Sequence, residues 1–218
     1  MPPYDADPDE ASLEAVNAQL MQATEAGSVM NARYLLEEGG ANVECRDRYG
    51  DTPLCLASHG GNSGMVRFLS EAGADVDGED DEGCTPVFAA ILNGQMEVAR
   101  ILVEERGADA NKVANDGKTP LHVSVLHNRL EFVKWLVTKV GADVQKVDNH
   151  GFTPLSLATR YDRTAVASFL QNWSLSVLPR RAVLVSVNFA RRQKPRLELL
   201  RFLAAAPDDI VRNIIEFV

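Results

Sequence analysis

Apolar residues follow helical spacing in two short segments that recur along the chain. In the clearest copy, residues 117–144, the first segment has its apolar positions at Leu121, Val125 and Leu126. A polar break follows, and the second segment has apolar positions at Leu130, Val133, Leu136 and Val137. Each set falls on one face of a helix, so the pattern predicts two consecutive amphipathic helices.

Turn-forming residues mark the same unit four times. Thr-Pro pairs begin at Thr52, Thr85, Thr119 and Thr153, at intervals of 33, 34 and 34 residues. Gly-Ala-Asp or Gly-Ala-Asn begins at Gly40, Gly73, Gly107 and Gly141. Each of these glycines precedes the next Thr by 12 residues, whereas the distance from Thr to the following Gly is 21, 22 and 22. One part of the unit therefore has a fixed length, and the other accepts one extra residue.

The marker residues predict where the helices start and stop. A Thr before Pro can cap free backbone N–H groups, and Pro suits the first helical position. The break between the two helices falls at Gly61, Gly94, Asn128 and Asp162. The glycine after the second helix is expected in the left-handed conformation, as at Gly107. The 12-residue piece must turn back on itself, and its Gly and Asp residues predict a hairpin-like turn.

A helix pair of this size cannot bury its apolar face alone, so the repeats must stack on one another. The pattern D-x-x-G-x-T-P-L resembles the ankyrin repeat. Its first position is matched by Asp47, Asp80 and Asp148 and departs at Ala114, and its usual His is present as His122. The resemblance implies an all-α solenoid of helix-turn-helix units with β-hairpin-like turns. The repeats expected are residues 12–46, 47–79, 80–113, 114–147 and 148–174.

The two ends of the chain depart from the period. The first repeat lacks Thr-Pro, and Ser12 is the expected N-cap of a longer first helix that follows an acidic arm, residues 1–11. Residues 175–218 are predicted to be helical, with an apolar stripe that contains Ile210, Ile214 and Ile215. This tail is interpreted as a cap on the last repeat. The alternative is an adaptor, because "APDDIVRNIIEFV" resembles the opening of an F-box-like helix.

Charge and composition narrow the function classes. The formal net charge of −9 argues against nucleic-acid binding. This charge is unevenly distributed along the chain. Residues 175–218 contain eight Lys/Arg and four Asp/Glu, a net charge of +4, so residues 1–174 carry a net charge of −13. No run of eighteen apolar residues occurs, so no membrane span is expected. The odd set Cys45, Cys55 and Cys84, with no secretory signal, predicts a cytoplasmic protein, with the nucleus as an alternative.

The sequence offers little catalytic chemistry. No nucleotide-binding, zinc-protease or serine-hydrolase motif is present, so we expect no enzyme activity, no cofactor and no metal. Cys55 and His59 are four residues apart and could share a metal, but core or surface roles are favoured. His122 is expected to bond near the Thr119 cap. The acidic run at residues 71–82 is either a solvated face or a site for a basic partner.

The repetition predicts a monomeric protein-binding scaffold, because variable positions on a repeated framework can specify another protein, here one that could carry a basic patch. The alternative is a substrate adaptor of a ubiquitin ligase. In the ankyrin pattern, the variable positions lie around the Gly of GxTP and late in the first helix. Cys84, Leu92 and Asn93 are among these variable positions. The predicted partner-binding residues are Arg48, Tyr49, Asp51, His59, Asp81, Glu82, Asn115, Asp116, Lys118, His127, Asn149, His150, Phe152, Arg160 and Tyr161. Tyr and Arg are common binding anchors, and the alternative is that the tips serve only solubility.

Overall fold

A computed structural model describes residues 8–173, and the chain divides into two compact units, Met1–Ala167 and Ser168–Val218. The described part is helical and contains no strand. The helices are α1 (Pro8–Glu25), α2 (Val29–Glu37), α3 (Pro53–Gly60), α4 (Ser63–Glu71), α5 (Pro86–Asn93), α6 (Met96–Arg100), α7 (Pro120–Leu126), α8 (Leu130–Trp135) and α9 (Pro154–Arg160). A further helix covers residues 164–173. The all-α repeat architecture expected from the sequence is confirmed.

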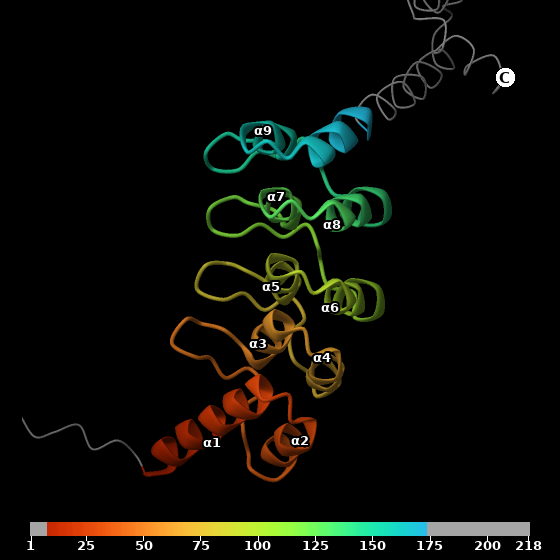
Figure 1. Ribbon diagram of the computed structural model, residues 1–218. Coiled ribbons are helices and arrows are strands. Elements are labelled where there is room, and N and C mark those ends of the chain that lie inside the picture. Colours follow the sequence, from red (N-terminus) through yellow and green to blue (C-terminus); the bar gives the residue numbers. More distant parts are fainter. Residues whose placement is uncertain (1–7, 174–218) are drawn as a thin grey trace, which may run out of the picture. The chain divides into compact units, whose positions relative to one another are not determined.

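Within the first unit the helices form two columns (Figure 1). The first helices of the repeats pack in series, α1 on α3, α3 on α5, α5 on α7 and α7 on α9. The second helices, α2, α4, α6 and α8, form the other column, and α2 packs on α4 and α4 on α6. Before each of α3, α5, α7 and α9 the chain makes a loop that projects away from both columns.

The Thr-Pro pairs start the first helices as predicted. Each Thr is extended, and its hydroxyl accepts the backbone N–H three residues later at 3.2–3.3 Å. In α7 the cap is reinforced, because the backbone N–H of Thr119 donates to Nδ1 of His122 at 3.2 Å. Nδ1 is therefore unprotonated, and the Nε2–H of the neutral ring donates to the carbonyl of Phe152 at 3.1 Å. His122 is the structural residue that the sequence predicts, and it also joins two repeats.

The core repeats with the sequence. The residue after each Thr-Pro is buried in three repeats, at Leu54, Val87 and Leu121. One leucine of the second helix is fully buried in successive repeats, at Leu69, Leu102 and Leu136. These side chains fill the space between the two columns, and burying each one stabilises the fold by about 1.5–3 kcal/mol. Since the same positions meet in every repeat, the contacts between repeats hold the stack together.

The variable length of the unit is absorbed at the end of the second helix. In repeats three and four, α6 and α8 continue as π-helical turns, Ile101–Glu105 and Leu136–Val140. The N–H of Ala108 then reaches the carbonyl of Leu102, six residues back, at 2.9 Å. In repeat two, which is one residue shorter, the N–H of Ala74 bonds the carbonyl of Leu69, five residues back, at 3.0 Å. A π-turn is the usual way for a helix to hold one extra residue.

Two expectations for the chain ends need comment. The prediction of Ser12 as an N-cap is wrong, because α1 already begins at Pro8, where Pro suits a first helical position and acidic residues follow. The interpretations of residues 175–218, as a cap or an F-box-like adaptor with Ile210, Ile214 and Ile215, lie outside the described residues, as do residues 1–7 of the acidic arm.

Candidate protein-binding surface

Four tight turns form the outer ends of the loops, and we call them tip 1 (residues 47–51), tip 2 (80–84), tip 3 (114–118) and tip 4 (148–152). In three of them the first residue is Asp, and its Oδ1 accepts the backbone N–H groups two and four residues later at 2.8–3.0 Å. In tip 3, which begins with Ala114, Oδ1 of Asp116 instead accepts the N–H of Lys118 at 2.9 Å. The Asp of the sequence pattern is therefore a structural residue of the turn.

Adjacent tips lie in direct contact. A backbone N–H of each later tip donates to a carbonyl of the tip before it, as from Asn115 to Glu82 at 2.9 Å and from Asn149 to Asp116 at 3.0 Å. The glycine of each tip has a positive φ, and a Cβ on Gly117 would lie 2.7 Å from the backbone nitrogen of Asn149. Gly117 is thus required for both its backbone conformation and its close neighbour.

Two of the predicted binding residues also support the tips. The side-chain amide of Asn115 donates to the carbonyl of Asp81 at 3.0 Å, and that of Asn149 donates to the carbonyl of Asn115 at 2.9 Å. Both side chains remain exposed. Any contact that they make with a partner therefore comes in addition to a structural role.

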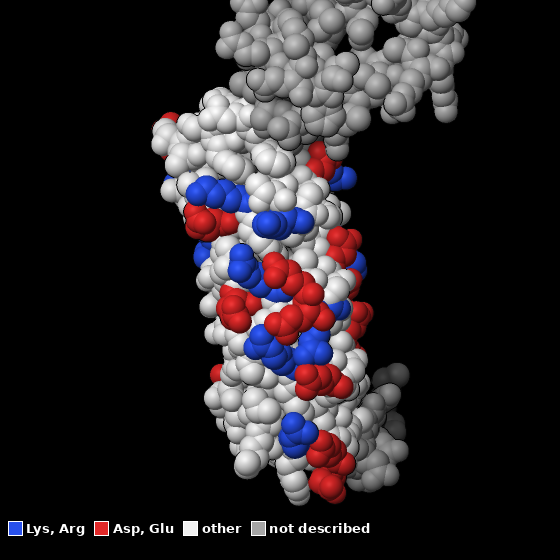
Figure 2. Space-filling model, turned by 90° about the vertical axis from the view of Figure 1, so that its right-hand side faces the viewer, with Lys and Arg blue, Asp and Glu red and all other residues white. Residues whose placement is uncertain are grey.

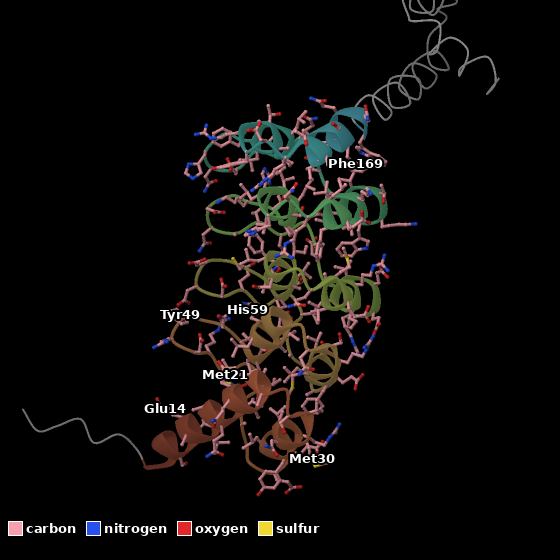
Figure 3. The ribbon with its side chains drawn as sticks, in the orientation of Figure 1. Glu14, Met21, Met30, Tyr49, His59 and Phe169 are labelled. Carbon is pink, nitrogen blue, oxygen red and sulfur yellow. The ribbon has the colours of Figure 1, made fainter. Side chains whose placement is uncertain are left out.

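The tips and the late residues of the first helices belong to one surface. Figure 3 shows Tyr49 at the outer end of tip 1 and His59 on α3, and the charge of His59 acts on the Asp51 carboxyl. In repeat five, the guanidinium of Arg160 lies over the ring of Phe152, 5.0 Å from its centroid. We therefore call the four tips, together with the late first-helix residues His59, Leu92, Asn93, Leu126, His127, Arg160 and Tyr161, the tip surface.

The tip surface is hollowed between tips 1 and 2. The hollow has a volume of about 330 Å³ and is lined by Arg48, Tyr49, Asp51, Asp80, Asp81 and Glu82. The pKa of the Asp51 carboxyl is raised to about 6, mainly by burial. The neighbouring carboxylates of Asp47, Asp80 and Glu82 contribute to this rise. The guanidinium of Arg48 lies over the Tyr49 ring, 4.8 Å from its centroid, and forms no ion pair with a described residue.

All fifteen predicted binding residues lie in the four tips or at the late first-helix positions, and most of them are exposed. The exposed members are Arg48, Tyr49, His59, Asp81, Glu82, Asn115, Asp116, His127, Asn149, His150, Arg160 and Tyr161. The half-buried members are Asp51, Lys118 and Phe152. Lys118 forms an ion pair with Asp116, and this pair neutralises tip 3.

One set of contacts beside this surface was not predicted from the sequence. After three of the four left-handed breaks, the next residue reaches back to a carbonyl at the end of the first helix of the preceding repeat. Gln95 donates to the carbonyl of His59 at 3.3 Å, Arg129 to that of Leu92 at 2.9 Å, and Arg163 to that of Leu126 at 3.0 Å. The signal in the sequence is a long polar side chain at intervals of one repeat. Its role is structural, because each side chain satisfies a free carbonyl at a helix end, and the positive charge of the two arginines is also favourable at a helix C-terminus.

The described residues offer no separate chemical centre. Burial raises the pKa of the Cys55 thiol to about 11 and of the Cys84 thiol to about 12, so neither is a ready nucleophile. No group of three or more His, Cys, Asp or Glu residues in residues 8–173 could hold a metal ion, and Cys55 and His59 thus gain no third ligand there. Among the described helices, none is both long and apolar enough to cross a membrane.

Comparison with known proteins agrees with this geometry. The family model described as "Ankyrin repeats (3 copies)" matches residues 20–114 and 106–177. A search of curated protein sequences gives no match. Ankyrin repeats generally mediate protein–protein interaction and are typically non-enzymatic modules. The repeat period, the capped helix pairs and the matched residues together lead to one conclusion, that the chain belongs to the ankyrin repeat family.

Proposed function

We propose that this protein is a non-enzymatic scaffold that binds another protein, one with a basic patch, through the tip surface. The observation that carries this proposal is the state of the acidic side chains in the hollow. Asp51, Asp81 and Glu82 form no ion pair with a described residue, although they lie close together. Four carboxylates and one guanidinium line the hollow, so a positively charged partner would relieve the repulsion among them.

Capture from the source cell with the full chain tests this proposal. The tip variant is Asp81→Ser with Glu82→Ser, and it keeps Asp80, whose carboxylate holds the turn. The matched control is Glu14→Ser with Glu38→Ser, which removes the same charge from exposed positions outside the tip surface. We expect the control to retain the partner and the tip variant to lose it. Equal retention by both variants would exclude the acidic hollow as the binding site and overturn the proposal.

Kinetics with the captured partner sharpen the test. Charges at an exposed interface act mainly on the association rate and are screened over about 8 Å at physiological ionic strength. We therefore expect the association rate to fall with salt and with the tip variant, and the dissociation rate to change less. Identification of a ubiquitin-ligase subunit among the captured proteins, with no effect of the tip variant, would favour the adaptor alternative instead.

A further inference from the structure

The charge on the tip surface changes sign along the stack. At repeats two and three, the hollow between tips 1 and 2 is acidic. At repeat five, the exposed charge of the tip surface is the guanidinium of Arg160, which forms no ion pair with a described residue. Its stacking on Phe152 fixes it beside tip 4, next to the exposed Tyr161. The surface thus has an acidic end and a cationic, aromatic end.

Between these ends the surface is neutral and partly apolar. The ion pair of Lys118 with Asp116 cancels the charge of tip 3. Four equivalent late first-helix positions are occupied by His59, Leu92, Leu126 and Arg160. The two middle ones are leucines, of which Leu92 is 39% exposed and Leu126 half-buried. An apolar side chain of a partner could cover them, with opposite charges on either side.

We propose that the tip surface selects a bipolar segment of its partner protein. A Lys or Arg of this segment binds in the hollow at Asp51, Asp81 and Glu82. An apolar residue covers Leu92 and Leu126, and an Asp or Glu pairs with Arg160. This inference rests on the proposed function and adds the chemistry of the partner and its orientation along the stack.

The spacing of the repeats sets the length of the segment. Neighbouring helices pack at 8–10 Å, so the hollow and Arg160 are on the order of 20–25 Å apart along the stack. An extended chain spans at most about 3.3–3.6 Å per residue, so about six or seven residues separate the two charged ends. This distance is short enough for one continuous segment to reach both.

Three synthetic peptides of equal length test the proposal by fluorescence anisotropy against the full chain. Each carries two central leucines in a serine background; the first ends in Lys and Glu, the second in Lys at both ends and the third in Glu at both ends. We expect the Lys/Glu peptide to bind most tightly, by about fivefold over either uniform peptide, because each uniform peptide keeps one exposed ion pair and replaces the other with a like-charge contact. Tightest binding of the Lys/Lys peptide would show that net charge alone decides, and would overturn the proposal, as would no binding of any peptide.

Charge reversal at one position provides the matched comparison. In Arg160→Glu both ends of the surface are acidic, so the order should change to favour the Lys/Lys peptide. Arg100→Glu makes the same change of net charge at an exposed position of α6, outside the tip surface, and should leave the order unchanged. Equal effects of the two variants would overturn the inference. If the captured partner still depends on Asp81 and Glu82, the proposed function stands even when this inference fails.

Discussion

The second-helix face and the tip surface of the same repeats carry their charges in different states. On the second-helix face, basic and acidic side chains lie side by side (Figure 2). Arg67 of α4 bonds Glu105 of the next repeat through both carboxylate oxygens, at 2.8 and 3.1 Å, and Arg106 bonds Glu71 at 2.7 Å. On the tip surface, Asp51, Asp81, Glu82 and Arg160 have no such partner in the described residues.

This difference separates charges that hold the stack from charges that are available to another molecule. The pairs on the second-helix face join repeats two and three, and the Nε1–H of Trp135 donates to Oε1 of Glu104 at 2.9 Å, which joins repeats three and four. Side chains that are satisfied inside the chain gain little from a partner. Unpaired side chains on the tip surface can still form their first ion pairs, and for this reason we propose that surface as the binding site.

Removal of one aromatic side chain from each face should give the largest contrast. Trp135 is 4% exposed, and Tyr161 is 49% exposed. Trp135→Ala should lower the free energy of unfolding by about 3–5 kcal/mol, because it leaves a cavity and unpairs Glu104. Tyr161→Ala should change it by no more than about 0.5 kcal/mol. Urea denaturation measures both, and comparable losses would mean that Tyr161 is part of the core rather than of a binding surface.

The tips should prove rigid even though they carry the unpaired charges. Gly117 and Gly151 have the same backbone conformation, with φ of 78° and 79°, but only Gly117 has a close neighbour. Gly151→Ala should cost about 1–2 kcal/mol for the left-handed backbone alone. Gly117→Ala should cost more, because its Cβ would lie 2.7 Å from the backbone nitrogen of Asn149. Equal midpoints in thermal unfolding would mean that the tips separate easily.

Much of the fold could be predicted from the sequence because its signals are local. The Thr-Pro caps depend on contacts within three residues, and the turn glycines on their own φ, which is 77° at Gly107 as expected. The distance of 21 or 22 residues from each Thr to the following Gly shows that some repeats contain one extra residue. It does not show which element of the repeat holds this residue. A loop and a π-helical turn satisfy the same spacing, and the structure shows that the extra residue lies in a π-helical turn, Ile101–Glu105 in one repeat and Leu136–Val140 in the next.

The sequence predicts which residues face outward, because the repeat fixes these positions, and they fall on the tip surface. It does not predict which of their charges are paired. Which charges are free depends on neighbours about one repeat away, as for Arg67 and Glu105, which are 38 residues apart. The sequence distinguishes Asp80, which recurs in the repeat pattern, from the variable Asp81, but only the structure shows that Asp80 holds its turn through two backbone N–H groups.

Removal of unpaired acids should not weaken the fold. Asp81→Ser with Glu82→Ser removes mutual repulsion in the hollow, so the free energy of unfolding should stay equal or rise by up to about 1 kcal/mol. Glu105→Ser should lower stability instead, because Arg67 loses its partner, and high salt should reduce that loss. Thermal unfolding at low and high salt measures both. A loss of stability in the tip variant would show that its carboxylates are structural.

The smallest expected effect is a pH dependence of stability that comes from Asp51, in the hollow of the tip surface. The folded-state pKa of Asp51 is raised to about 6 from a model-peptide value near 3.8, so the folded protein binds more protons than the unfolded chain between these values. Stability therefore falls as the pH rises from about 4 to 6, and the charged carboxylate is unfavourable at pH 7.

Asp51→Asn removes this unfavourable charge. It should stabilise the protein at pH 7 by about half a kcal/mol, once solvent screening is allowed for. The gain should shrink as the pH falls towards 4 and disappear below about pH 3, where Asp51 is protonated in both states. The charged groups that act on Asp51 belong to Asp47, Asp80, Glu82 and His59. A matched series with His59→Gln therefore separates the part of the pH dependence that is due to His59.

The same carboxyl should make partner binding depend on pH. Since a cationic partner favours the charged form of Asp51, its affinity for the parent protein should increase as the pH rises through 6, and this increase should be absent in Asp51→Asn. A pH profile of binding that is the same in both proteins would place the partner outside the hollow.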